Sequence, residues 1–275
     1  MPATLFTTIS ADGTDVRAYD EGRGPVLLIV GPGMDDGTRT KKLAALLARR
    51  FRVLRLQRRR YRLDLKTGGT PCSAAREVDD VLALARAVGG PAFLYGHSSG
   101  GVIALEALAA SPSSFAGAVI FEPAAVTGPP LGGEEGAVVR RARAAIAAGR
   151  PGRALTIFMR EVVGLPAWQA ASAGALTGLI PRYRRLVGRQ IDDLEAMNEL
   201  GVRLDAYARI DVPVLLLGGD RSPAHLAERL DAIEHVLPHG HRVVMPKRDH
   251  SADLKAPRQV AHIIGTLADS TNKRP

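Results

Sequence analysis

Short apolar runs alternate along this chain with longer segments that carry apolar residues at helical spacing. The clearest run, residues 25–30, is apolar throughout and ends at Gly31 and Pro32. Further strands are expected at 51–56, 92–95, 117–121, 212–217 and 241–245, and helices at 38–50, 73–88, 102–110, 223–237 and 257–268. Strands that are apolar on both faces and alternate with helices predict an α/β fold, with a mostly parallel sheet covered by helices on both faces.

Two regions depart from this alternation. Residues 4–10 and 15–19 have strand-like patterns separated by Asp12 and Gly13, which predicts an N-terminal hairpin. Residues 124–207 contain no convincing strand, and helices are expected there over 137–148, 154–163 and 182–200. We therefore expect one core domain, built from residues 1–123 and 208–275, and a helical insertion at 124–207.

The composition fits one large globular domain and argues against several other classes of protein. The chain has 275 residues, of which 46% are hydrophobic, so it can bury a sizeable core. We find neither a secretory signal pattern nor the roughly 20 consecutive apolar residues of a membrane span. The one cysteine, Cys72, cannot form an internal disulfide and fits a reducing compartment. We expect a cytoplasmic protein with no membrane partner.

The charge is strongly positive, with 37 basic residues against 28 acidic ones. Arginine clusters can bind nucleic acid, but this chain has no recognition motif and no aromatic residues interleaved with the clusters. We expect no nucleic-acid partner. His235, His239 and His241 lie close together in sequence without a carboxylate or cysteine in a ligand pattern, so no metal site is expected.

The motif Gly96-His97-Ser98-Ser99-Gly100 lies between an expected strand and an expected helix. This is the context of a nucleophile elbow, a tight turn that exposes a serine hydroxyl above the sheet. The glycines relieve crowding where strand and helix nearly touch, and the following helix N-terminus favours a developing negative charge. Ser98 is therefore the candidate nucleophile.

On this motif and its place in the chain, the sequence resembles the α/β-hydrolase family over nearly its whole length. The resemblance implies an eight-stranded sheet, a helical cap inserted after the sixth strand, and a Ser-acid-His triad. Residues 124–207 fall where the cap belongs. His250 matches the family's histidine, which follows the last strand, although Lys247-Arg248-Asp249 replaces the usual small residues before it.

Two carboxylates compete for the role of triad acid. Asp220 follows the strand at 212–217, two residues before the usual family position, where this chain has Ser222. Glu122 follows the strand at 117–121, and some α/β-hydrolases similarly place their acid there. We favour Glu122 and keep Asp220 as the alternative. The acid would accept a hydrogen bond from His250 and stabilise its imidazolium form.

The oxyanion hole requires two backbone N–H groups directed at the developing negative charge. One is expected from Ser99, directly after the nucleophile, and the other from Met34, with Gly33 as second choice. The family's glycine-rich loop after the strand at 51–56 is replaced by residues 57–61, which are rich in arginine. We expect an exposed basic loop there, with an arginine reaching an anionic substrate group as the less favoured alternative.

The resemblance implies a serine hydrolase that cleaves a carboxylic ester or lactone through an acyl-enzyme, without a cofactor. Phe158, Met159 and Trp168 of the insertion are candidates to bind a small, largely apolar substrate, and Tyr183 and Met197 are weaker ones. Cofactor-free C–C hydrolysis or perhydrolysis and a non-catalytic ligand-binding homologue remain alternatives. The protein is expected to be a monomer or a homodimer.

Overall fold

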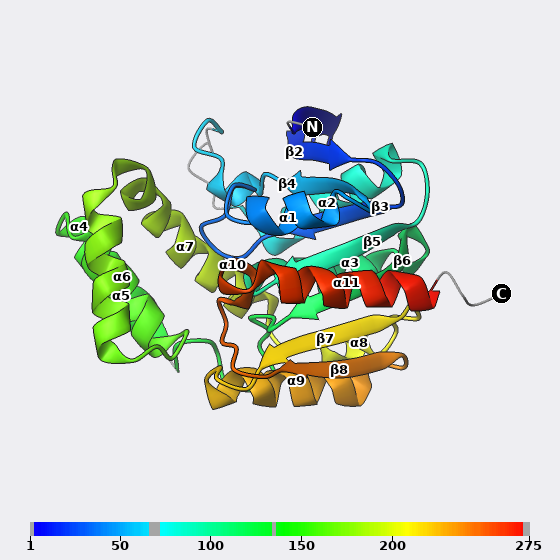
Figure 1. Ribbon diagram of the computed structural model, residues 1–275. Coiled ribbons are helices and arrows are strands. Elements are labelled where there is room, and N and C mark those ends of the chain that lie inside the picture. Colours follow the sequence, from blue (N-terminus) through cyan, green and yellow to red (C-terminus); the bar gives the residue numbers. More distant parts are fainter. Residues whose placement is uncertain (1–2, 66–71, 134–135, 272–275) are drawn as a thin grey trace.

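The computed structural model describes residues 3–65, 72–133 and 136–271, and these contain an eight-stranded sheet in the order β1-β2-β4-β3-β5-β6-β7-β8 (Figure 1). The β1–β2 and β2–β4 pairs are antiparallel, and all other pairs are parallel. The strands are β1 (Thr4–Ile9), β2 (Asp15–Gly22), β3 (Val26–Val30), β4 (Arg52–Leu56), β5 (Ala92–His97), β6 (Phe115–Phe121), β7 (Val214–Gly219) and β8 (Gly240–Met245). The predicted mostly parallel sheet and the predicted N-terminal hairpin are confirmed.

Helices cover both faces of the sheet because the central strands are apolar on both sides. In β3, Leu28 and Val30 join one core cluster, whereas Leu27 and Ile29 join the other. The first cluster is covered by α2 (Ala74–Ala87), α3 (Ser99–Ala110), α8 (Leu204–Tyr207) and α9 (Ala224–Val236), and the second by α1 (Lys41–Leu47), α10 (Ala252–Lys255) and α11 (Pro257–Thr271). Within the described part of the chain, no helix has both the length and the apolar character that crossing a membrane would require.

Within the described residues, four helices besides α8 lie between β6 and β7, and they extend beyond the end of the sheet in Figure 1. They are α4 (Ala137–Ala147), α5 (Pro151–Glu161), α6 (Ala167–Leu179) and α7 (Pro181–Leu200), and all of them fall within the expected 124–207 insertion. Helix α6 was not among the predicted helices, because its alanine- and glycine-rich sequence has no clear apolar stripe. It packs closely on α5, where a Cβ on Gly174 would lie 2.4 Å from the Gly152 carbonyl oxygen.

The expectation of an exposed basic loop after β4 is wrong. Arg58, Arg59, Arg60 and Arg62 are each at most 7% exposed. The first three form ion pairs with buried or half-buried acids, and Arg62 pairs with Asp15 and with the exposed Asp64. Their partners come from α2, from α7, from the turn and second strand of the N-terminal hairpin, and from the loop that follows Arg62. All of these acids except Asp64 are distant in sequence, so residues 57–62 alone give no indication of the pairing.

Candidate active site

Ser98 occupies the turn between β5 and α3 with φ 55° and ψ −126°, a backbone conformation that a non-glycine residue rarely adopts. The turn is tied to the neighbouring strand, because the Ser98 N–H donates to the Phe121 carbonyl oxygen at 3.0 Å. It is also packed against β3, since a Cβ on Gly100 would lie 2.2 Å from the Gly31 carbonyl oxygen. These contacts hold the serine, half-buried, at the carboxyl end of the sheet.

Glu122 and His250 are brought together at the same edge. His97 of β5 and Phe121 of β6 are partners in the parallel register, so the next residues, Ser98 and Glu122, leave the sheet side by side. Glu122 Oε2 lies 2.6 Å from His250 Nδ1, and its Oε1 accepts the Gly219 N–H at 2.8 Å. The carboxylate is 1% exposed, whereas the His250 side chain is 17% exposed.

The electrostatic environment keeps Glu122 ionised. Burial alone would raise its pKa, but the hydrogen bond and charge of His250 and the Gly219 N–H outweigh burial and lower it. A carboxylate that stays charged beside Nδ1 fixes the N–H at that nitrogen and leaves Nε2 as the acceptor. The described residues provide no hydrogen bond between the Ser98 hydroxyl and His250; such contacts are often long in unliganded enzymes.

Asp220 is placed differently from Glu122. It is exposed, and its Oδ1 accepts the Arg248 backbone N–H at 3.3 Å. The hydrogen bond to His250 thus comes from Glu122, the carboxylate at the end of β6. Ser222, which stands at the usual family position of the acid, has its hydroxyl near Glu122 and contributes to lowering the pKa of that carboxyl.

The two expected oxyanion donors belong to the loop after β3 and to the start of α3, two segments that contact each other at Gly31 and Gly100. Ser99 is the first residue of α3, and Met34 has φ 59° in the loop after β3. Within the described residues neither the Met34 N–H nor the Ser99 N–H has a hydrogen-bond partner. Gly33, the second choice, packs against α7, because a Cβ there would lie 2.0 Å from Gln190 Oε1.

The expected substrate-binding residues separate into two groups. Phe158 and Met159 of α5 are half-buried and pack, together with Met34, against an apolar cluster of the insertion. This cluster consists of Ala142, Ala145, Ala154, Leu155, Val187 and Ile191. Trp168 of α6 is 70% exposed, Tyr183 is 40% exposed and Met197 is buried in the main core. Apolar side chains of the insertion therefore adjoin the loop of Met34.

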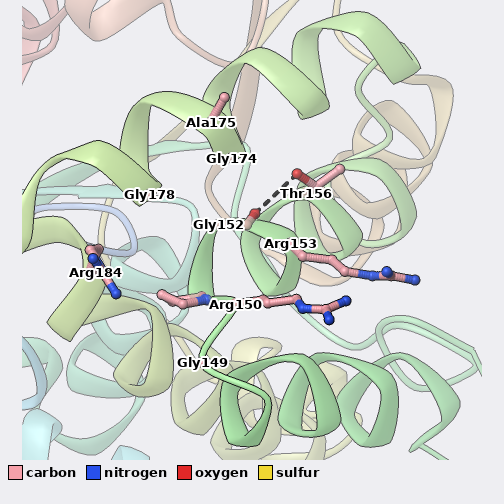
Figure 2. A pocket seen from close by; sticks show the side chains of 10 residues that line it. Gly149, Arg150, Gly152, Arg153, Thr156, Gly174, Ala175, Gly178 and Arg184 are labelled. Atoms are coloured by element: carbon pink, nitrogen blue, oxygen red, sulfur yellow. Dashed lines mark hydrogen bonds between the residues drawn. The ribbon is translucent and has the colours of Figure 1, made fainter.

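A cavity of about 410 Å³ lies within the insertion, between the start of α5, α6 and the start of α7. Figure 2 shows that Arg150, Arg153 and Arg184 line it together with glycines, and that Thr156 bonds to the Gly152 carbonyl oxygen. None of the sequence-predicted site residues lines this cavity. It is therefore separate from the serine and histidine described above.

A second histidine–acid pair, which the sequence did not reveal, packs against His250. His97 Nδ1 lies 2.9 Å from Asp253 Oδ2, and the His97 ring stacks on Phe121. The centroids of the His97 and His250 rings are 4.7 Å apart. Burial lowers the pKa of His97, so it is a neutral packing partner of His250 near neutral pH. In the described residues no group of three or more histidine, cysteine or acidic side chains is placed to hold a metal ion.

Comparison with known proteins identifies the family. Residues 26–263 match the model of a family described as the alpha/beta hydrolase family. The chain belongs to that family. A solved structure of an alpha/beta hydrolase from Sphaerobacter thermophilus is 27% identical to this hydrolase, with a TM-score of 0.76 over 94% of this chain and 98% of that one. The expected fold class is thereby confirmed.

Two further solved structures share the fold at lower sequence identity. An esterase from Rhodococcus is 22% identical, with a TM-score of 0.73 over 97% of this chain and 99% of that one. A carboxylesterase from Bacillus subtilis is 16% identical, with a TM-score of 0.70 over 97% and 91% of the two chains. At these identities the likeness concerns the fold of this α/β hydrolase and leaves its substrate open.

Proposed function

We propose that this α/β hydrolase cleaves a carboxylic ester or lactone through an acyl-enzyme formed on Ser98. The observation that carries the proposal is the 2.6 Å contact between Glu122 Oε2 and His250 Nδ1, made beside a serine on a strained strand-to-helix turn. The names of the Rhodococcus and Bacillus subtilis relatives agree with an ester as the substrate.

In the proposed reaction His250 Nε2 removes the proton of the Ser98 hydroxyl as the oxygen attacks the ester carbonyl carbon. Glu122 holds the imidazole orientation and stabilises its protonated form. The imidazolium then gives the proton to the leaving alkoxide, so the alcohol departs and the acyl group stays on Ser98. A water molecule, deprotonated by the same histidine, releases the carboxylic acid and restores the serine.

The negative charge of each tetrahedral intermediate requires two hydrogen-bond donors, for which we assign the N–H groups of Met34 and Ser99. Both are free of partners within the described residues. Phe158 and Met159 adjoin the Met34 loop, so we assign the apolar part of a small substrate to that side. Trp168, at 70% exposure, would take part only if the insertion closes over bound substrate.

Intact mass after exposure to a fluorophosphonate tests this proposal. The wild type should gain one adduct, and Ser98→Ala, with an unchanged circular dichroism spectrum, should gain none. A panel of p-nitrophenyl esters, lactones and matched amides then tests the bond cleaved, with turnover of esters or lactones expected to dominate. A folded wild type that takes no adduct would contradict the proposal and favour a ligand-binding role.

A further inference from the structure

The guanidinium of Arg58 is completely enclosed directly behind the Ser98 turn. Its Nε and Nη2 bind the two Glu77 oxygens at 3.0 and 2.9 Å, and Nη2 also binds Asp193 Oδ1 at 3.0 Å. Its Nη1 donates to Ser99 Oγ at 2.8 Å and to the Gly31 carbonyl oxygen at 3.3 Å. All five donors of the guanidinium are therefore used within the protein, and none is left for a substrate.

The far side of this cluster belongs to α7, the helix of the insertion that runs back to the sheet (Figure 1). Asp193 is fully buried, and its Oδ2 accepts the Tyr61 hydroxyl at 2.7 Å. The same hydroxyl lies 3.1 Å from Oε1 of Gln190, which is 5% exposed. Gln190 and Asp193 are three residues apart, so they project from one face of the helix.

These two α7 side chains reach the two separate halves of the proposed oxyanion hole. The Gln190 amide packs on Gly33, next to Met34, leaving no room for a Cβ at that glycine. Asp193 reaches Ser99, the other donor residue, through Arg58. We propose that Gln190 and Asp193, with Arg58, are positioning residues that set the oxyanion hole from the helical insertion. This inference rests on the proposed function and deepens it.

The chemistry of the cluster suits positioning better than binding. Arg58 and Arg60 balance Glu77 and Asp193, so the cluster carries no net charge to attract a ligand. Burying ions costs desolvation energy. Compared with apolar residues of the same size, a buried ion cluster therefore adds fixed, directional hydrogen bonds rather than extra stability. A guanidinium whose five N–H groups all donate hydrogen bonds holds Ser99, and with it the first turn of α3, in one place. A small displacement of a donor from the oxyanion can reduce the rate about a hundredfold.

The expected signature is a loss of kcat with little change in KM, because the hole stabilises the transition state rather than the bound ester. The test uses the full-length protein and p-nitrophenyl acetate, whose short acyl group limits contact with the insertion. Four variants are compared: Gln190→Ala, Asp193→Asn, Asp193→Ala and the control Asp192→Asn. Asp192 neighbours Asp193 on α7 but pairs with Arg143 inside the insertion, at 2.5 Å.

We expect Gln190→Ala and Asp193→Ala to lower kcat about tenfold to a hundredfold, with KM within about threefold of wild type. Asp193→Asn keeps an acceptor for Arg58 and should recover part of the loss, and Asp192→Asn should stay within about twofold. Affinity for a trifluoromethyl ketone, which forms an oxyanion on the serine, should fall by the same factor as kcat/KM. A merely structural role would lower the melting temperature and leave both kcat and the trifluoromethyl ketone affinity of the folded variants unchanged.

If Asp193→Ala does not fold, Gln190→Ala and Asp193→Asn still test whether the α7 side chains position the oxyanion hole. The inference is overturned if both keep kcat and trifluoromethyl ketone affinity within about twofold of Asp192→Asn while the wild type reacts with fluorophosphonate. A wild type that does not react contradicts the proposed function itself, and this inference falls with it. The fluorophosphonate reaction of the wild type thus distinguishes the two failures.

Discussion

The Ser98 turn is flanked by two buried carboxylates that are partnered in opposite ways. On one side Glu122 contacts His250, whose side chain is 17% exposed. On the other side Asp193 contacts Arg58, and both side chains are 0% exposed. The first pair holds an imidazole that reaches the surface, whereas the second pair encloses a cation that stays charged at any physiological pH.

The difference indicates a division of labour around one serine. His250 can accept a proton from the serine and pass it on, and its ring reaches solvent. Arg58 is completely buried and keeps its proton, because its pKa is raised well above its usual value. The Asp193–Arg58 pair can therefore act only by holding the nearby backbone in place. On this view the Glu122–His250 pair governs chemistry and the Asp193–Arg58 pair governs geometry and stability, so removing each should have different effects.

The largest effect is expected on the His250 side. Glu122→Gln keeps the shape of the side chain but removes the charge that orients the imidazole, so kcat/KM should fall about 10³–10⁴-fold. The matched control is Asp220→Asn, which alters an exposed carboxylate bonded to the Arg248 N–H and should change kcat/KM less than about threefold. Ester hydrolysis by both folded variants is the measurement. Equal losses would contradict the assignment of Glu122.

A large loss of stability is expected on the Arg58 side. Among the described residues, Arg58→Met leaves Glu77 and Asp193 buried with Arg60 as their one remaining cationic partner. Breaking a buried ion pair by removing one member typically costs about 3–5 kcal/mol. Urea unfolding at pH 7 should show a reduction of that size in the free energy of unfolding. A loss below about 1 kcal/mol would mean that the enclosed pair is worth no more than a surface pair.

Asp35, in the loop after β3, is a buried acid whose hydrogen-bond donors are uncharged groups. Its oxygens accept the Arg39 backbone N–H at 2.8 Å and the Thr40 hydroxyl at 3.3 Å. Burial raises its pKa to about 6. Between about pH 4 and pH 6 the unfolded chain ionises this group while the folded protein keeps it protonated, so stability should fall as the pH rises.

This fall should reach roughly 3 kcal/mol, since each pKa unit corresponds to about 1.4 kcal/mol. Asp35→Asn cannot ionise and should remove that part of the pH dependence, becoming more stable than wild type at pH 7. Urea unfolding of both proteins at pH 4.5 and pH 7 provides the measurement. Identical changes between the two pH values in wild type and variant would contradict the prediction.

The smallest effect is expected at an exposed pair of the insertion. Arg143 is 40% exposed and contacts both Asp192 and Glu195 of α7. Arg143→Ala should reduce the free energy of unfolding by less than about 1 kcal/mol, because solvent screens the charges. The same urea experiment checks this. A loss equal to that of Arg58→Met would remove the distinction between enclosed and exposed pairs.

The strands and the serine turn could be predicted because their signals are local. The apolar runs and the Gly96–Gly100 motif each lie within a few residues, and β3, β5 and α3 formed close to where they were expected. Residues 57–62 could not be interpreted in this way. Four of these six residues are arginines, which by themselves indicate a solvated loop. Their burial depends on acidic partners elsewhere in the chain, such as Asp193, which is 135 residues from Arg58.

By itself the sequence determined the alternation of strands and helices, the place of Ser98 and the position of the helical insertion, because hydrophobic period and turn chemistry act over short distances. Only the tertiary structure decided that Glu122, rather than Asp220, bonds to His250. It also decided that the arginine loop lies inside the protein. Both results depend on which distant side chains share a buried space, where an ion persists only with a partner supplied by another part of the chain.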